Sequence, residues 1–232
     1  MKKSNKLLLG GFITVMLLIA GIHVALYAKY NNGNYTIYHR EDKRAQYSMQ
    51  PYPNVLFVTI RDVRGATIQF ADVAEVENGK EHVIQYEQKG DSLIITGRND
   101  EYYTDGRRLV NLTLPYGVNL SAVNSFLYFE KGKSAAVINP VINLKRSHAI
   151  FFDSEAHFQL GNVKLIASDS SLARFQSKTM INQLEVQLSK SALEYNEGDA
   201  GQLSIITDSV SRLSLQSKHF LKAKITTIPN NP

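Results

Sequence analysis

The sequence contains no cysteine in its 232 residues. This absence excludes disulfide bonds, thiol catalysis and metal sites with cysteine ligands. If the folded part of the chain is exported, its stability must therefore come from packing and hydrogen bonding alone. The lack of cysteine does not by itself assign the protein to a compartment.

Motifs for catalysis and cofactor binding are also missing. The chain has no G-x-G-x-x-G or Walker pattern, and its histidines form no H-x-H or H-E-x-x-H spacing. These histidines lie at positions 23, 39, 82, 148, 157 and 219. The sequence therefore predicts no catalytic residue, no cofactor and no metal ion, and the protein is not expected to be an enzyme.

Two clusters come closest to a chemical site. The first combines groups that a hydrolase would use: His148, Asp153, Ser154 and His157. It lacks a nucleophile elbow and a glycine-rich oxyanion turn, so solvated residues on alternating strands explain it better. The second is acidic and contains Asp100, Glu101 and Asp105. It does not have the spacing of an EF-hand, so it is interpreted as an acidic turn and not as a calcium site.

The positive charge is concentrated at one end of the chain. The formal net charge is +5, and residues 1–29 contribute four lysines and no acid. The remaining residues carry 22 basic and 21 acidic side chains, with isolated basic clusters at Lys131-Gly132-Lys133 and Lys145-Arg146. A domain with so little net charge does not form a track for nucleic acid, so no nucleic-acid partner is predicted.

The longest uncharged run extends from Leu7 to Tyr27. As a helix, its 21 residues would cover about 30 Å, the thickness of the bilayer core. The alternatives are a buried core helix and a cleaved signal peptide. A signal peptide usually has a shorter apolar run and small residues at its cleavage site, whereas Leu26 and Tyr27 are bulky. An uncleaved transmembrane anchor is therefore predicted.

The distribution of lysines around this run predicts its orientation. Lys2, Lys3 and Lys6 precede the span and only Lys29 follows directly, so the N-terminus should remain in the cytoplasm. The predicted location is the cell inner membrane, with a single pass and a periplasmic C-terminal domain. The expected segments are a cytoplasmic tail at 1–6, a transmembrane helix at 7–27, a juxtamembrane linker at 28–54 and a β domain at 55–228.

Residues 55–115 show the pattern of β-strands. The runs VLFVTI, ATIQF, HVIQY and SLIIT are each ended by Gly, Asp or Asn, and a later strand stops at Pro115. Gly79, Gly90 and Gly97 are expected at turns where a positive φ is needed, with Lys89-Gly90-Asp91 closing a hairpin.

From Ile142 to Ile225 one apolar pair recurs with steps of 21, 21, 19 and 20 residues. The pairs are Ile142/Leu144, Val163/Leu165, Leu184/Val186, Leu203/Ile205 and Ala223/Ile225. A second series lies half a period away, at Ile150/Phe152, Leu172/Phe175, Leu193/Tyr195 and Leu213/Leu215. Leu172/Phe175 breaks the alternation, which indicates either a bulge or a register error of one residue.

This period predicts an all-β fold, a right-handed β-solenoid or β-helix-like domain that follows a single transmembrane helix. Val163, Leu184 and Leu203 would form one inward ladder, and the polar clusters at 168–171, 189–191 and 207–209 would form corners. Residues 196–201 would be a longer excursion from the stack. An antiparallel sandwich is the competing fold, because short strands at this spacing predict it too.

The sequence also resembles the auto-transporter adhesin, head GIN domain family, a Bacteroidetes-type β-solenoid domain. The resemblance covers roughly residues 54–226 and depends on GDSLIITG at 90–97, on Leu112-Thr113-Leu114-Pro115 and on the serine-rich corners. Members carry Ser-Gly-Ser-Gly at these corners, whereas this chain has Ser168-Asp169-Ser170-Ser171 and Ser189-Lys190-Ser191. The resemblance implies a β-solenoid and supplies no catalytic residue, ligand or cofactor.

The leading functional hypothesis is a membrane-anchored, extracytoplasmic β-solenoid scaffold or adhesin-like binding protein without catalytic activity, whose partner is an unidentified protein or glycan. The alternative is an LptC-like periplasmic component that transfers lipid or lipopolysaccharide. These hypotheses differ in one respect: whether inward residues such as Phe152, Phe175 and Tyr195 pack shut or line an apolar groove. A third possibility, a polysaccharide lyase on a β-helix, would need clustered charges across the coils.

Overall fold

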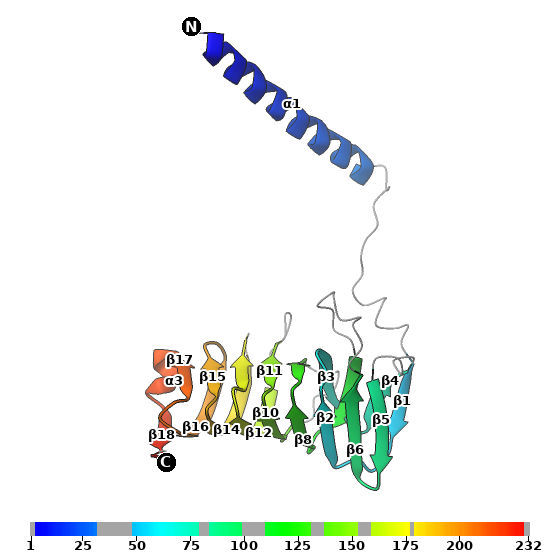
Figure 1. The fold of residues 1–232 in the computed structure, drawn as a ribbon, viewed down its shortest axis with the longest axis vertical. Helices are drawn as coiled ribbons and strands as arrows, with labels where there is room; N and C mark the ends of the chain where they lie inside the picture. The colour runs from blue at the N-terminus through cyan, green and yellow to red at the C-terminus, as the bar shows by residue number, and fades with distance from the viewer. Residues whose placement is uncertain are drawn as a thin grey trace. The chain divides into compact units, whose positions relative to one another are not determined.

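The computed structural model describes residues 3–31, 48–78, 84–98, 110–130, 137–152, 159–176 and 179–229 (Figure 1). The chain divides into two compact units, Met1–Gln46 and Tyr47–Pro232. The first contains a single helix among its described residues, and the second contains the strands.

Unit 1 is built around helix α1, Lys3–Asn31. Its segment Leu9–Lys29 is long and apolar enough to cross a membrane. His23, within this segment, places Nδ1 2.9 Å from the carbonyl oxygen of Ile19, one turn earlier in the same helix. The predicted apolar helix is thus present, and His23 hydrogen-bonds locally.

Unit 2 consists of two sheets, each with nine strands in the described residues. Sheet A runs in the order β1 (Met49–Tyr52), β4 (Ala74–Glu77), β7 (Val110–Pro115), β3 (Ala66–Ala71), β9 (Phe126–Phe129), β11 (His148–Phe151), β13 (Leu172–Phe175), β15 (Ala192–Tyr195) and β17 (Arg212–Leu215). Sheet B runs in the order β18 (Ala223–Thr227), β16 (Asp199–Thr207), β14 (Met180–Ser189), β12 (Gln159–Ser168), β10 (Val141–Lys145), β8 (Asn119–Val123), β2 (Phe57–Arg61), β6 (Ser92–Gly97) and β5 (Ile84–Lys89). A short helix, α3 (Ser217–Phe220), connects β17 to β18.

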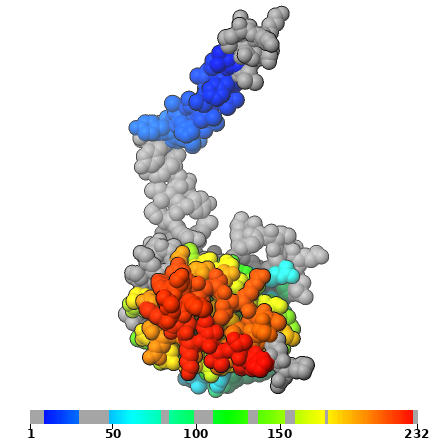
Figure 2. Space-filling model, turned by 90° about the vertical axis from the view of Figure 1, so that its left-hand side faces the viewer, coloured from blue at the N-terminus to red at the C-terminus, as the bar shows by residue number. Residues whose placement is uncertain are grey.

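From β8 onward the chain alternates between the sheets, so that each coil places one strand in sheet A and one in sheet B. All strand pairs in this part are parallel. Figure 2 views unit 2 from the end where the last coil, in red and orange, covers the stack. The predicted β-solenoid is confirmed, and the antiparallel sandwich is excluded because such a fold joins neighbouring strands as hairpins.

The inward ladder of sheet B is confirmed except at its first step. Val163 pairs with Leu184 and Leu184 with Leu203, as predicted. Ile142, however, pairs with Leu165, 23 residues later, and not with Val163. A shift of two residues keeps every inward side chain inward, because side chains in a strand alternate with period two. The apolar pattern therefore could not distinguish the two registers.

In sheet A, Phe175 and Leu193/Tyr195 of the second series point inward as predicted, whereas the prediction for Ile150/Phe152 and for Leu172 was one residue off. Ala149 and Phe151 point into the core, not Ile150 and Phe152, and Ala173 takes the place expected for Leu172. No bulge is present in β13, which alternates regularly. The larger apolar residue was expected inside at Ile150 over Ala149 and at Leu172 over Ala173. The small Ala side chains are buried at the positions two residues before the inward aromatic rings.

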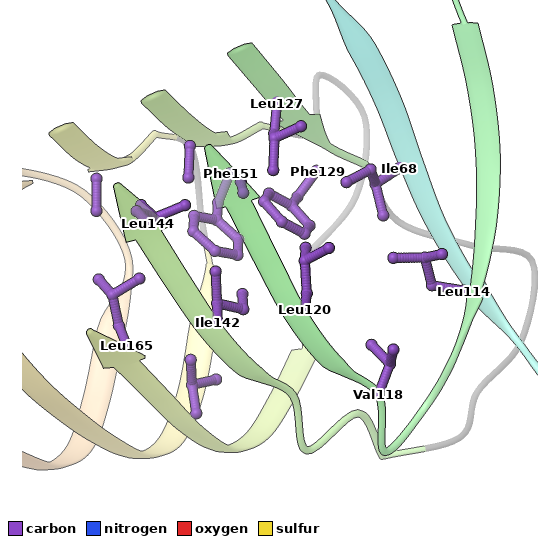
Figure 3. Packing of buried hydrophobic residues seen from close by; sticks show 14 of the residues in the cluster. Ile68, Leu114, Val118, Leu120, Leu127, Phe129, Ile142, Leu144, Phe151 and Leu165 are labelled. Carbon is purple, nitrogen blue, oxygen red and sulfur yellow. The ribbon is translucent and has the colours of Figure 1, made fainter. Parts of the chain in front are cut away.

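A column of stacked aromatic rings runs along the core. Phe129, Phe151 and Phe175 stack nearly parallel, with ring centroids 4.5 and 4.3 Å apart. Phe70 continues the column at one end, and Tyr195 and His219 continue it at the other. Figure 3 shows Phe129 and Phe151 side by side above Leu120, Ile142 and Leu165 of sheet B. Such pairs contribute about 0.5–1.5 kcal/mol each beyond the area that they bury.

The leading half has an order that the sequence did not predict. The coil made by β2 and β3 lies between β6–β7 on one side and β8–β9 on the other (Figure 1). The remaining strands of this end, β1, β4 and β5, pair antiparallel. The strands β2 and β3, although early in the chain, therefore lie inside the stack.

Two glycines of GDSLIITG have different roles. Gly90 has a φ of 61° and closes the β5–β6 hairpin, as predicted. Gly97 has no positive φ. It is required because an added Cβ would lie 2.1 Å from the carbonyl oxygen of Asp62, so the expectation of a φ-positive turn there was wrong. Gly79 lies outside the described residues.

The excursion expected at 196–201 is a short corner instead. β16 begins at Asp199, and Gly198 turns with a φ of 88° against the backbone of Thr179. The early parts of β12, β14 and β16 add a third buried ladder, Leu160, Ile181 and Ala200. At the other end of the unit, β1 occupies part of the segment 28–54, which was expected to be linker.

Candidate functional site

The corners that lead from sheet B to sheet A share one design. A residue in the left-handed region comes first, and these residues are Asp62, Asn124, Arg146, Asp169 and Lys190, with φ between 49° and 56°. A buried serine follows in most coils, at Ser125, Ser147, Ser171 and Ser191. The predicted polar corners are thus present, and they form a continuous ladder along the stack.

Backbone N–H groups of one corner donate to serine hydroxyls of the next. Ser125 N–H donates to Ser147 Oγ and Ser147 N–H to Ser171 Oγ, both at 3.1 Å. Ser147 Oγ donates in turn to the Lys145 carbonyl at 2.8 Å. Each buried hydroxyl therefore satisfies groups on two coils, which a glycine at that position could not do.

The last such corner uses an aspartate. Asp208 accepts hydrogen bonds from the Ser211 hydroxyl and from the backbone N–H groups of Lys190, Ser211 and Val210. The Ser211 hydroxyl, followed by the backbone donors, lowers the pKa of Asp208 below its usual range. The carboxylate thus stays ionised and holds the turn.

Next to the corner at Asn124 and Ser125, the outer face of sheet A carries aromatic side chains. Phe126 contacts Tyr128 and His148, with ring centroids 4.9 and 5.1 Å apart. Ile150 pairs with Tyr128 in the next coil and Leu172 pairs with His148 one coil further. All five side chains are partly exposed, so a largely apolar band extends over three coils.

An open groove of about 410 Å³ adjoins this band. It is lined by Arg64, Asn124, Ser125, Phe126, Arg146 and His148. Arg146 Nε donates to Asn124 Oδ1 at 2.7 Å, and Asn124 Nδ2 donates to Asp62 Oδ1 at 3.0 Å. The groove thus combines two guanidinium groups with an aromatic wall, and its size is within the roughly 300–1,000 Å³ of small-molecule sites.

The outer face of sheet B is mostly polar. One row passes through Asn119, Val141, Lys164, Glu185, Ser204 and Lys224. Apolar residues are scattered among them, at Phe57, Ile94, Val123, Ile166 and Ile206, which is normal for a protein surface. The predicted solvated positions Lys164, Glu185, Gln187, Ser204, Lys222 and Lys224 are confirmed as partly or fully exposed.

The two clusters that resembled chemical sites are not assembled by the described residues. Of the hydrolytic group, only His148 is described, and it faces outward against Phe126. Asp153, Ser154 and His157 lie outside the described residues, as do Asp100, Glu101, Asp105 and Lys131-Gly132-Lys133. Within the described part of the chain, no group of three His, Asp or Glu is placed to hold a metal ion.

The sequence analysis missed the groove. It interpreted Lys145-Arg146 as an isolated basic pair, yet Arg146 lines the groove while Lys145 forms an exposed ion pair with Asp169 at 3.6 Å. Arg64 and Phe126 were not singled out because they are far from Arg146 in sequence. The stacking of the β2–β3, β8–β9 and β10–β11 coils brings them together.

The inward aromatic residues are packed shut. Phe151, Phe175 and Tyr195 are at most 1% exposed, and each contacts the next ring of the column. Burial, and to a lesser degree Asp199, raises the pKa of Tyr195. Burial, reinforced by Lys218, lowers the pKa of His219, which stacks on the Tyr195 ring. An open lipid trough through this part of the core, which the LptC-like alternative requires, is not formed.

Comparison with known proteins gives matches of low similarity only. No family profile matches the chain. No curated protein matches the chain. A proposed adhesin from Parabacteroides distasonis is similar in structure, with 10% identity and a TM-score of 0.26, over 79% of this chain and 94% of that one. A proposed cell adhesion protein from Clostridium sporogenes has 8% identity and a TM-score of 0.26, over 79% and 97%.

Proposed function

We propose that the protein is a membrane-anchored scaffold without catalytic activity, which binds a protein or glycan partner outside the cytoplasm through the outer face of sheet A. The observation that carries this proposal is the band Phe126, Tyr128, His148, Ile150 and Leu172, partly exposed beside the arginine-lined groove. Aromatic and arginine side chains are the types most enriched where proteins bind partners.

The solenoid supports such a role mechanically. Each outward side chain is fixed by a strand that is paired with parallel strands on both sides, and the aromatic column behind it fills the core. A face that is already ordered loses little conformational entropy when it binds. Stacked coils commonly present an extended surface of this kind.

The anchoring is part of the same proposal. Residues 1–6 would lie in the cytoplasm, 7–27 would span the inner membrane, 28–54 would act as the tether and 55–228 would form the periplasmic domain. The apolar segment Leu9–Lys29 and the lysines before it support this orientation. Protease added to spheroplasts should digest the β domain. The same protease added to intact cells should leave the β domain undigested. Digestion only after the inner membrane is broken would contradict the orientation.

Binding is tested with the full-length chain in nanodiscs of neutral phosphatidylcholine, probed against a panel of cell-surface glycans and proteins. The double variant Phe126→Ala/Tyr128→Ala removes the aromatic centre of the band. The control Asn119→Ala/Ser121→Ala alters the equivalent outward positions of β8 in sheet B. Loss of binding only in the first variant is expected. Equal binding by both variants, absence of any ligand, or turnover of a panel member would overturn the proposal.

A further inference from the structure

We propose that the groove lined by Arg64, Asn124, Ser125, Phe126, Arg146 and His148 binds a carboxylated sugar, such as a uronic acid unit of an acidic polysaccharide. This inference rests on the proposed function and specifies the ligand class of the same face. The charge of the groove and its aromatic wall support this ligand class.

The charge of the lining favours an anion. Two of the six lining side chains are guanidinium groups and none is a carboxylate. Asp62, whose carboxylate accepts a hydrogen bond from Asn124, offsets part of this charge. Guanidinium groups bind carboxylates through two parallel N–H donors, and this geometry is more selective than that of an ammonium group.

The position of Arg146 is fixed before any ligand binds. Its Nε donates to Asn124, which is itself held by Asp62. Because Nε is used for this contact, the Nη groups form the end of the side chain that remains to meet a ligand. A guanidinium group ordered in this way loses little side-chain entropy on binding.

The aromatic wall favours a sugar over a small inorganic anion. The Phe126 ring, flanked by Tyr128 and His148, offers an apolar platform beside the guanidinium groups. A pyranose ring has an apolar C–H face and polar edges, and a uronic acid adds one carboxylate at its rim. Such a ligand can place its C–H face on the platform while its carboxylate reaches Arg146.

The backbone conformation at Arg146 belongs to the corner of the coil. Its φ of 49° lies in the left-handed region, which a glycine would adopt without strain. The same conformation recurs at Asp62, Asn124, Asp169 and Lys190. Lys190 has nearly the same geometry, with a φ of 50°, in a corner that does not line the groove. The pair therefore offers a matched test.

The experiment titrates the full-length chain in neutral nanodiscs with trigalacturonate and with its uncharged methyl ester. Wild-type protein should bind trigalacturonate at least about tenfold more tightly than the ester. Arg146→Gly should weaken trigalacturonate binding about tenfold, whereas Lys190→Gly should leave it unchanged. The melting temperatures of the two glycine variants should be similar to each other, so a loss of binding confined to Arg146→Gly cannot be attributed to unfolding.

Other outcomes would overturn the inference in distinguishable ways. Equal affinity for the acid and its ester would refute the carboxylate and leave the proposed binding face intact. Competition by citrate or phosphate as strong as that by the sugar would show a simple anion site. No binding at millimolar trigalacturonate, or binding unaffected by Arg146→Gly, would refute the ligand class. The proposed function is tested separately, by measuring the binding of the variant Phe126→Ala/Tyr128→Ala to the panel of cell-surface glycans and proteins.

Discussion

The outer faces of sheets A and B differ although one core supports both. Sheet A carries an aromatic band beside two arginines, whereas sheet B presents mostly Asn, Ser, Lys, Glu and Gln. The inward side chains of both sheets are mostly Leu, Ile, Val, Ala and Phe, with Tyr195 in sheet A. The comparison shows that the inward ladders specify the coil and leave the outward positions free to specialise.

The difference also shows how a solenoid forms a site. Parallel pairing in register places residues some twenty positions apart directly beside each other. Phe126 and His148 become neighbours in this way, as do Asn124 and Arg146 across one corner. A binding surface thus needs only one or two suitable residues from each coil.

The largest predicted effect comes from the core that the faces share. Phe151→Ala should destabilise unit 2 by about 3–5 kcal/mol, because it removes a fully buried ring between Phe129 and Phe175. Ile150→Ala, on the outer face of the same strand, should cost about 1 kcal/mol or less. Urea denaturation of the full-length chain measures both. Equal losses would mean that the inward and outward sides of β11 are wrongly assigned.

The next effect concerns the corner that joins the sheets. Ser147→Ala should cost about 1–3 kcal/mol, because the buried N–H of Ser125 loses its acceptor. Ser189→Ala, at an exposed position, should remain within about 0.5 kcal/mol of wild type. Indistinguishable denaturation midpoints for the two variants would show that the serine ladder does not stabilise the stack.

Smaller still is the effect of removing the left-handed residues. Arg146→Gly and Lys190→Gly each relieve a positive φ and raise the entropy of the unfolded chain, so their stabilities should stay within about 1 kcal/mol of wild type. Calorimetry checks this expectation. A marked loss at Arg146 alone would show that its contact with Asn124 is structural.

The smallest predicted effect concerns the change of the melting temperature with pH. Burial lowers the pKa of His219, so the folded state keeps this residue neutral while the unfolded chain takes up a proton. Its contribution is fully present above the unfolded pKa of about 6.5 and is lost as the pH falls from there toward the lowered folded value. His219→Phe, which preserves the stack on Tyr195, should flatten the melting temperature between pH 7 and about pH 5. A slope equal to that of wild type would contradict the burial.

The sequence predicted those parts of the fold that depend on periodicity. Alternation at Leu184/Val186 and Leu203/Ile205 identified inward positions, and the serine clusters identified corners. Periodicity could not fix the step from Ile142 to Leu165, since a shift of two residues preserves the inside and outside. It also could not place β2 and β3 within the stack, because the strand order depends on long-range pairing.

The candidate site could not be predicted from local sequence patterns, for a different reason. Arg64, Phe126 and Arg146 come from three coils, and none belongs to a motif. One signal was present: Arg146 occupies a corner position equivalent to Asp169 and Lys190, in corners where the resembled family carries glycine. Only the register between the coils shows that these residues lie next to each other and line one groove.

The most direct test attaches the same bulky label to the outer face of sheet A or of sheet B and compares the binding of the partner. The chain has no cysteine, so Ile150→Cys in sheet A and Ile166→Cys in sheet B can each be labelled at one site with a bulky maleimide. Both isoleucines point outward and are partly exposed, in strands with parallel neighbours on both sides. The account predicts that the label at position 150 abolishes partner binding and that the label at position 166 does not. Binding that survives the label at 150, or is lost equally at both positions, would contradict it.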